Sequence, residues 1–92
     1  MALFTVQIAY IEDADRVNAV RPTHREYLTS LLEAGKLHES GPFADGTGAL
    51  LVYDVADRAE LDEVVAADPY TKNGIIASAE VREWNVVFSK FA

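Results

Sequence analysis

The stretch that decides the fold is ALLVYDVADRAELDEVVAAD, residues 49–68. Its first part, residues 49–55, is the most apolar strand-like run of the chain and predicts a central β-strand. Asp57 follows, with Glu60 three positions later, and this pairing of a helix cap with a reciprocal glutamate predicts that a helix begins there. Pro69 is expected to end that helix. The stretch therefore supplies a strand and the helix that follows it.

Three more strands and one more helix are predicted around this stretch. Residues 3–10 alternate with period two and predict the first strand. Pro22 suits the first turn of a helix and disfavours helical geometry in the residue before it, so we expect the helix to begin there and to stop at Gly35. Residues 37–40 predict a short edge strand and residues 81–91 the last strand. The order β-α-β-β-α-β is the ferredoxin-like α+β arrangement, with a four-stranded antiparallel sheet.

Length, charge and cysteine content narrow the class of protein. Residues 1–92 are expected to form one domain. The formal net charge of −7 repels phosphate backbones and anionic lipid headgroups, so we expect neither nucleic acid nor a membrane as a partner. The chain has no cysteine, which excludes disulfides and thiolate metal sites. Because no signal peptide or membrane span is predicted, a cytoplasmic location is expected.

The predicted sheet carries apolar residues on both faces. In the first strand, Phe4, Val6 and Ile8 lie on one face and Leu3 and Ala9 on the other. Trp84 and Phe88, in the predicted last strand, are expected to pack in the core or in a dimer. Two helices cover only one face of the sheet, so a second copy of the chain is the simplest cover for the other face. We therefore expect a homodimer formed through the sheet face.

Two polar residues stand where the predicted helices turn apolar side chains inward. His24 precedes Leu28 by four positions, and Asp68 follows Val64 by four positions. The predicted topology brings both to the same end of the sheet. A carboxylate at the end of a helix faces the negative end of the helix dipole, at a cost of roughly 0.3–1 kcal/mol, and a histidine could offset this by donating a hydrogen bond to it. Such a pair is either a structural staple or a base with a fixed tautomer.

Several motifs resemble the YciI-like, or YCII-related, family. They cover essentially the whole chain in order, and they are Arg21-Pro-Thr-His24 with Leu28, Ala34-Gly-Lys-Leu37, Ser40-Gly-Pro42 and Ala67-Asp-Pro-Tyr70. The resemblance implies a ferredoxin-like fold of the dimeric α+β barrel superfamily. It also implies an active site on a histidine and an aspartate, which match His24 and Asp68. Some relatives resemble dehydrochlorinases and muconolactone isomerases that act on small ring-cleavage acids without metal. The loop of residues 43–48 is shorter than is common in the family.

These features predict a lyase or isomerase that uses no cofactor and no metal and acts on a small unsaturated carboxylate or lactone. His24 is the expected general base, because imidazole has a pKa of about 6.5, and Asp68 is expected to orient it. Arg21 is the candidate to bind an anionic ligand, although it could instead pair with a nearby acid. Further substrate-binding candidates are Tyr10, Ser40 and Tyr70. His38, on the edge strand, is expected to be exposed to solvent.

Two alternatives from other classes stay open. The chain could be a binding module that holds a small metabolite without converting it. It could also be an accessory dimer in which His24 and Asp68 form a buried structural pair. In that case, replacing His24 would lower the stability by about 1–3 kcal/mol, because Asp68 would lose its hydrogen-bond partner.

Overall fold

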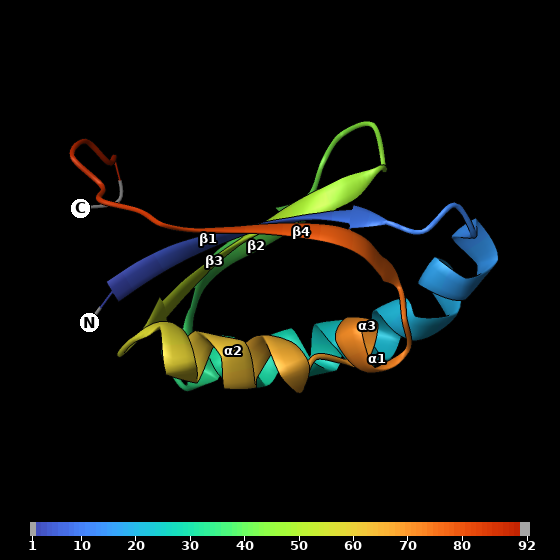
Figure 1. Ribbon diagram of the computed structural model, residues 1–92, viewed down its shortest axis with the longest axis horizontal. Coiled ribbons are helices and arrows are strands. Elements are labelled where there is room, and N and C mark those ends of the chain that lie inside the picture. The colour runs from blue at the N-terminus through green and yellow to red at the C-terminus, as the bar shows by residue number, and fades with distance from the viewer. Residues whose placement is uncertain (1, 91–92) are drawn as a thin grey trace.

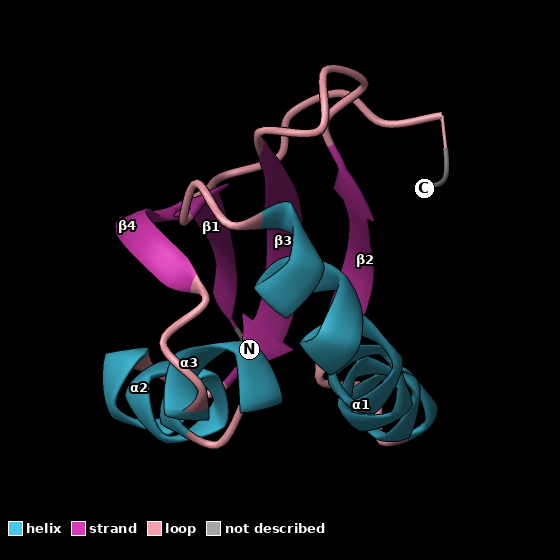
Figure 2. Cartoon of the chain, turned by 90° about the vertical axis from the view of Figure 1, so that its right-hand side faces the viewer, coloured by secondary structure: helices cyan, strands magenta, loops and turns pink. Residues whose placement is uncertain are grey.

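The computed structural model describes residues 2–90, and all its helices lie on one side of a single sheet (Figure 1). The elements in chain order are β1 (Ala2–Tyr10), α1 (Ala14–Glu33), β2 (Leu37–Pro42), β3 (Gly48–Val55), α2 (Arg58–Ala66), α3 (Pro69–Lys72) and β4 (Ile76–Glu83). The four strands are antiparallel, in the order β2-β3-β1-β4 (Figure 2). The predicted ferredoxin-like α+β fold is thus confirmed, with β3 central and β2 at an edge.

The core lies between the sheet and the helices. β1 and β3 pair along their length, from Ala2 opposite Val55 to Ala9 opposite Gly48. Because side chains alternate between faces, every second residue of these strands points to the helix layer. The most deeply buried large side chains of the core are Val6, Tyr53, Val55, Leu61, Tyr70 and Ile75. No helix within residues 2–90 is long and apolar enough to cross a membrane.

The first helix is longer than the sequence predicts. α1 begins at Ala14, so Pro22 lies inside it, and the carboxylate of Asp13 caps it by accepting a hydrogen bond from the backbone N–H of Arg16 at 3.2 Å. Proline cannot donate the hydrogen bond that would continue the helix, and the helix bends between its two halves (Figures 1 and 2). The predicted start at Pro22 was wrong because the geometry of the preceding residue is disfavoured rather than forbidden, and a good cap lies upstream.

The second helix ends earlier than predicted and a third helix follows. Asp57 caps α2 as expected, accepting from the N–H of Glu60 at 2.9 Å, while the Glu60 side chain accepts from the N–H of Ala56 at 2.8 Å. α2 stops at Ala66, and Pro69 is the first residue of α3 rather than only a stop signal. Asp68 is therefore the N-cap of α3, where a carboxylate is favourable.

The last strand lies earlier in the chain than residues 81–91. β4 pairs with β1 from Ile76 opposite Tyr10 to Glu83 opposite Phe4. One further backbone hydrogen bond, from the N–H of Trp84 to the carbonyl of Leu3, closes the ladder. The prediction was wrong because the segment after Trp84 is rich in apolar residues but extends past the first residues of β1, its partner strand. Trp84 and Phe88, 46% and 94% exposed, do not pack in the core of this chain, and residue 91 lies outside the described residues.

Candidate active site

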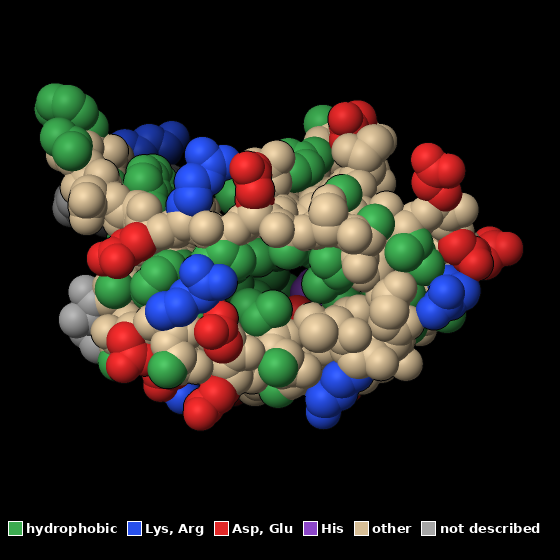
Figure 3. Space-filling view, in the orientation of Figure 1, with side chains coloured by type: hydrophobic (Ala, Val, Ile, Leu, Met, Phe, Trp, Pro, Cys, Tyr) green, Lys and Arg blue, Asp and Glu red, His purple; other side chains and the backbone are tan. Residues whose placement is uncertain are grey.

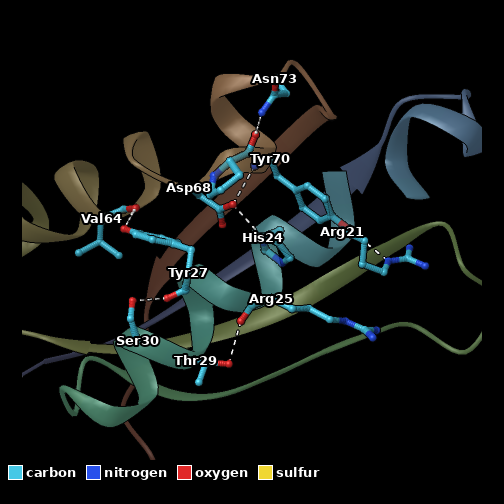
Figure 4. A network of polar contacts seen from close by, with 11 residues as sticks. Arg21, His24, Arg25, Tyr27, Thr29, Ser30, Val64, Asp68, Tyr70 and Asn73 are labelled. Carbon is cyan, nitrogen blue, oxygen red and sulfur yellow. Dashed lines mark hydrogen bonds and ion pairs between the residues drawn. The ribbon is translucent and has the colours of Figure 1, made fainter. Parts of the chain in front are cut away.

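A buried histidine–carboxylate pair lies at one end of the core, as predicted. His24 Nδ1, on α1, lies 2.7 Å from Asp68 Oδ1, at the junction of α2 and α3 (Figure 4). The two residues are only 7% and 4% exposed. Asp68 Oδ1 also accepts the backbone N–H of Tyr70 at 2.8 Å, so the predicted dipole penalty on this carboxylate is offset by the cap of the next helix. Figure 3 shows a histidine side chain only at the bottom of a hollow between the sheet and the helices.

The pair fixes which imidazole nitrogen is available for chemistry. An ionised carboxylate can only accept hydrogen bonds, so Nδ1 of His24 carries the proton and donates it to Asp68. In the neutral imidazole, Nε2 then keeps its lone pair. Within residues 2–90, no hydrogen bond engages Nε2. Asp68 therefore holds Nδ1 of His24, and Nε2 is the nitrogen that is available to accept a proton.

Aromatic packing holds the imidazole ring in place. The ring of Tyr70 is stacked on that of His24, with centroids 3.7 Å apart and planes within 7°. Tyr10 meets Tyr70 edge-on, with a centroid distance of 5.7 Å. Burial raises the pKa of Tyr10, and the neighbouring Tyr70 raises it further, so the Tyr10 hydroxyl stays protonated near neutral pH. His24 is thus restrained both at its edge and on its face.

Arg21 is attached to this cluster through Tyr70. Its Nε donates to the Tyr70 hydroxyl at 3.3 Å, and its Nη1 donates to Asn18 Oδ1 at 3.1 Å. The hydrogen bond to Tyr70 raises the pKa of the guanidinium, which therefore stays cationic. The sequence left open that Arg21 pairs with a nearby acid, namely Asp13 or Asp15, but the structure pairs it with Tyr70 and Asn18 instead.

A cavity of about 160 Å³ opens beside His24. Its polar lining includes five of the six residues predicted from the sequence, and the sixth, Asp68, lies behind His24 in contact with it. The lining residues are Tyr10, Arg21, His24, Arg25, Leu28, Ser40, Gly41, Pro42, Ala49, Leu51 and Tyr70. His38 lines a different hollow and is exposed, as predicted, with its Nδ1 3.1 Å from Glu39 Oε2. The structure therefore brings together all of the predicted site residues.

Two residues near the site were missed by the sequence reasoning. Arg25 lines the cavity, and the available signal was its spacing, four positions after Arg21 on the same helix. Tyr27 donates its hydroxyl to the backbone carbonyl of Val64 at 2.6 Å and so joins α1 to α2 behind the His24–Asp68 pair (Figure 4). Burial raises the pKa of Tyr27, and the nearby Asp68 carboxylate adds to the shift.

A second and larger cavity of about 640 Å³ adjoins the first, because Tyr10 and Arg21 line both. It lies between the end of β1, the start of α1 and the β2–β3 loop, and its lining includes the acidic residues Glu12 and Asp13. No group of three or more His, Cys, Asp or Glu side chains among the described residues is arranged to hold a metal ion.

Solved structures with this fold include a dehydrochlorinase. The 5-chloro-2-hydroxyhydroquinone dehydrochlorinase TftG of Burkholderia phenoliruptrix, in complex with 2,5-dihydroxybenzoquinone, is 25% identical over 90% of this chain and 93% of that chain, with a TM-score of 0.80. An antibiotic biosynthesis monooxygenase is 20% identical over 95% of this chain and 99% of that one, with a TM-score of 0.62. Rv0793 of Mycobacterium tuberculosis is 14% identical over 97% of both chains, also with a TM-score of 0.62. The last two likenesses show the fold alone. Among curated proteins, no sequence matches this chain.

The family itself is shown by the match of a family model to most of the sequence. The model describes the YCII-related domain and matches residues 2–85, which include β1 to β4 and both members of the buried pair. The structural neighbours have the ferredoxin-like arrangement of the dimeric α+β barrel proteins. This chain therefore belongs to the YCII-related domain family.

Proposed function

We propose that the protein is a cofactor-free lyase or isomerase that acts on a small unsaturated carboxylate or lactone. The observation that carries this proposal is the 2.7 Å contact between His24 and Asp68, buried beside a cavity. A buried base with a fixed tautomer and one free nitrogen has the properties that proton abstraction from carbon requires. The likeness to a dehydrochlorinase supports a lyase reaction.

In this proposal, Nε2 of His24 removes a proton from the carbon beside a carbonyl group. The electron pair of the broken C–H bond moves into an enolate, whose charge Arg21 offsets, and Asp68 stabilises the imidazolium that forms. In a lyase, the enolate then expels a leaving group together with its bonding electrons. In an isomerase, the imidazolium returns the proton to a different carbon. A base of this kind typically contributes about 10²–10⁴-fold to the rate.

The size and lining of the cavity limit the substrate. A cavity of about 160 Å³ is similar to the engineered apolar cavity of about 150 Å³ that holds benzene, so one six-membered ring or a chain of similar volume fits. The bound 2,5-dihydroxybenzoquinone of the dehydrochlorinase is a ligand of this size. Tyr10 and Ser40 are the hydroxyl groups that we propose as substrate contacts, and Tyr70 contributes through its ring and its hold on Arg21.

The test begins with a thermal-shift screen of small carboxylic acids and lactones, followed by a turnover assay of each compound that binds. We expect His24→Ala to lower the turnover by about 10²–10⁴-fold while the fold is retained. His38→Ala is the matched control, because it removes the exposed histidine, and it should leave the turnover unchanged. An unaltered rate in folded His24→Ala would overturn the proposal.

A non-catalytic binding or accessory role is the second candidate, and one observation favours it. The His24–Asp68 pair is buried, and Asp68 Oδ1 accepts hydrogen bonds from both His24 and the backbone of Tyr70, as in a structural pair. This role predicts that a ligand stabilises the protein without any product being formed. It also predicts that His24→Ala lowers the free energy of unfolding by about 1–3 kcal/mol, because Asp68 loses a partner.

We also propose that a second copy covers the outer face of the sheet, the face turned away from the helices. Leu50 of β3 points to this face and is 37% exposed. The apolar residues that follow β4 are exposed as well, and they are Trp84, Val86, Val87 and Phe88. The fold of the dimeric α+β barrel proteins supports a second copy as the cover.

A cytoplasmic location and the lack of nucleic-acid and membrane partners stay predictions from the sequence.

A further inference from the structure

We propose that Arg25 is a second anion-binding residue of the cavity and that the site selects small dianions, molecules with an anionic group at each of two ends. This inference rests on the proposed function only in using the same cavity, and it concerns binding rather than the reaction. It gives a role to a residue that the sequence motifs did not single out.

The charge of the cavity is opposite to that of the protein. The chain has fifteen acidic residues and eight lysines and arginines. The charged residues that line the cavity, however, are Arg21 and Arg25, and the lining includes no aspartate or glutamate. Asp68 lies behind His24, and its carboxylate is engaged by His24 and by the backbone of Tyr70. An anionic ligand is therefore attracted to this cavity although the surface as a whole repels it.

Arg25 has a guanidinium group that is free to bind a ligand. Within residues 2–90, that group makes no hydrogen bond or ion pair, and only the backbone carbonyl of Arg25 is engaged, by the Thr29 hydroxyl at 2.9 Å. Other arginines bind protein groups instead: Arg58 lies 2.9 Å from Asp62, and Arg82 lies 3.1 Å from Glu80. Arg25 thus stands at the cavity with all of its side-chain donors unused.

The two cavity arginines are spaced to bind the two ends of one small molecule. Arg21 and Arg25 are four residues apart on α1, which places them on the same face, about 6 Å apart along the helix axis. Figure 4 shows both side chains extending in the same direction past His24. A guanidinium group matches the geometry of a carboxylate, so each arginine can bind one anionic end while a carbon between them lies near His24.

The neighbouring cavity is a poor alternative for the second anionic group. Glu12 and Asp13 contribute to its lining and would repel a second carboxylate placed there. Arg21 alone would then serve the ligand, and Arg25 would have no role in binding. The distribution of charge therefore favours a ligand that lies across the smaller cavity, between Arg21 and Arg25.

The experiment compares two probes of the same length. Muconate is a six-carbon diene with a carboxylate at each end, and sorbate has the same chain with a methyl group in place of one carboxylate. Dissociation constants are measured by calorimetry for the wild type, for Arg25→Gln and for Arg58→Gln, a surface control whose arginine lies in an ion pair away from the cavity. We expect the wild type to bind muconate at least tenfold more tightly than sorbate. Arg25→Gln should remove most of this difference by weakening muconate, and Arg58→Gln should leave it unchanged.

The possible results test the dianion site and the proposed reaction separately. Equal affinity of the wild type for both probes, no binding of either at millimolar concentration, or an equal loss of both in Arg25→Gln would overturn the dianion site. A preference for muconate that depends on Arg25, without turnover of any acid or lactone, would keep the dianion site and count against the lyase or isomerase. Turnover that depends on His24, without such a preference, would do the reverse.

Discussion

Two regions of the molecule depart from the usual pattern of burial in opposite directions: the end of the core around His24, and the outer face of the sheet together with residues 84–88. Around His24, ionisable groups are buried, and Oδ1 of the Asp68 carboxylate accepts two hydrogen bonds. On the outer face and in residues 84–88, apolar side chains lie in an exposed place. A hydrogen-bonded cluster of ionisable groups beside a cavity is typical of a ligand-binding site, whereas an exposed apolar surface is typical of a protein interface. We therefore propose chemistry in the first region and assembly in the second.

The largest expected effect is on kcat, when the charge of Asp68 is removed without a change in the shape of its side chain. Asp68→Asn keeps an oxygen that can accept from His24 and from the Tyr70 backbone, but it removes the negative charge that stabilises the imidazolium. We expect kcat to fall by about 10²-fold or more, with KM changed little, because the residues that line the cavity are untouched. Steady-state kinetics on a compound from the screen measures both constants. If kcat is retained, the His24–Asp68 pair is structural, and the proposal that the buried region performs chemistry is contradicted.

The next effect tests the assembly region. Leu50→Glu places a charge on the outer face of β3, where a second copy is proposed to pack, and we expect the dissociation constant of the dimer to rise by about 100-fold, or about 2.7 kcal/mol. Sedimentation or light scattering over a range of concentrations measures this change. Leu32→Glu is the matched control, because Leu32 is also an exposed leucine but lies on α1. Equal behaviour of the two variants would contradict an interface on the sheet face.

The sequence could predict that His24 and Asp68 lie at the same end of the sheet, because the helices and strands that place them have clear local patterns. Helical spacing turned His24 inward, and the alternating direction of the strands brought it to the same end of the sheet as Asp68, which lies just past the end of α2. That the two side chains touch was not predicted, because the contact joins residues 44 positions apart and depends on how α1 packs against the α2–α3 junction. The double role of Asp68 was missed, because it depends on α3, a helix of one turn whose sequence shows no apolar periodicity.

Other features depend on partners that are far away in the sequence. The end of β4 is set by where β1 begins, because the two strands are antiparallel. The apolar residues from Trp84 onward would suit a strand, but they have no strand to pair with. Arg25 was missed because a charged helical residue is ordinarily a solvated one, and only the position of the cavity distinguishes it from the other arginines. The start of α1 was missed because its cap, Asp13, outweighed a proline signal within the helix.

A smaller effect is expected where β3 joins the two regions. A Cβ atom at Gly48 would overlap the backbone carbonyl oxygen of Ile8, and neither strand can move without disturbing Ala49 in the cavity or Leu50 on the outer face. We expect Gly48→Ala to lower the free energy of unfolding by about 1–3 kcal/mol. Denaturant unfolding measures it, and Gly41→Ala, where a Cβ meets no atom within 4 Å, should cost less. Equal losses would contradict the close approach of the two strands.

The smallest expected effect is on how the free energy of unfolding depends on pH, and it concerns the buried Tyr53. Burial, with smaller contributions from Asp68 and Tyr27, raises the pKa of Tyr53, so its hydroxyl stays protonated in the folded chain where a tyrosine in the unfolded chain, with a pKa of about 10, ionises. The unfolded state then binds fewer protons, so stability is fully present below pH 10 and falls above it, by about 1.4 kcal/mol per pH unit for this one group. Tyr53→Phe should reduce the slope of unfolding free energy against pH by that amount above pH 10 and leave it unaltered at pH 8. A slope that Tyr53→Phe does not change would show that the loss of stability at alkaline pH comes from other groups, such as Tyr10 and Tyr27, whose pKa values burial also raises.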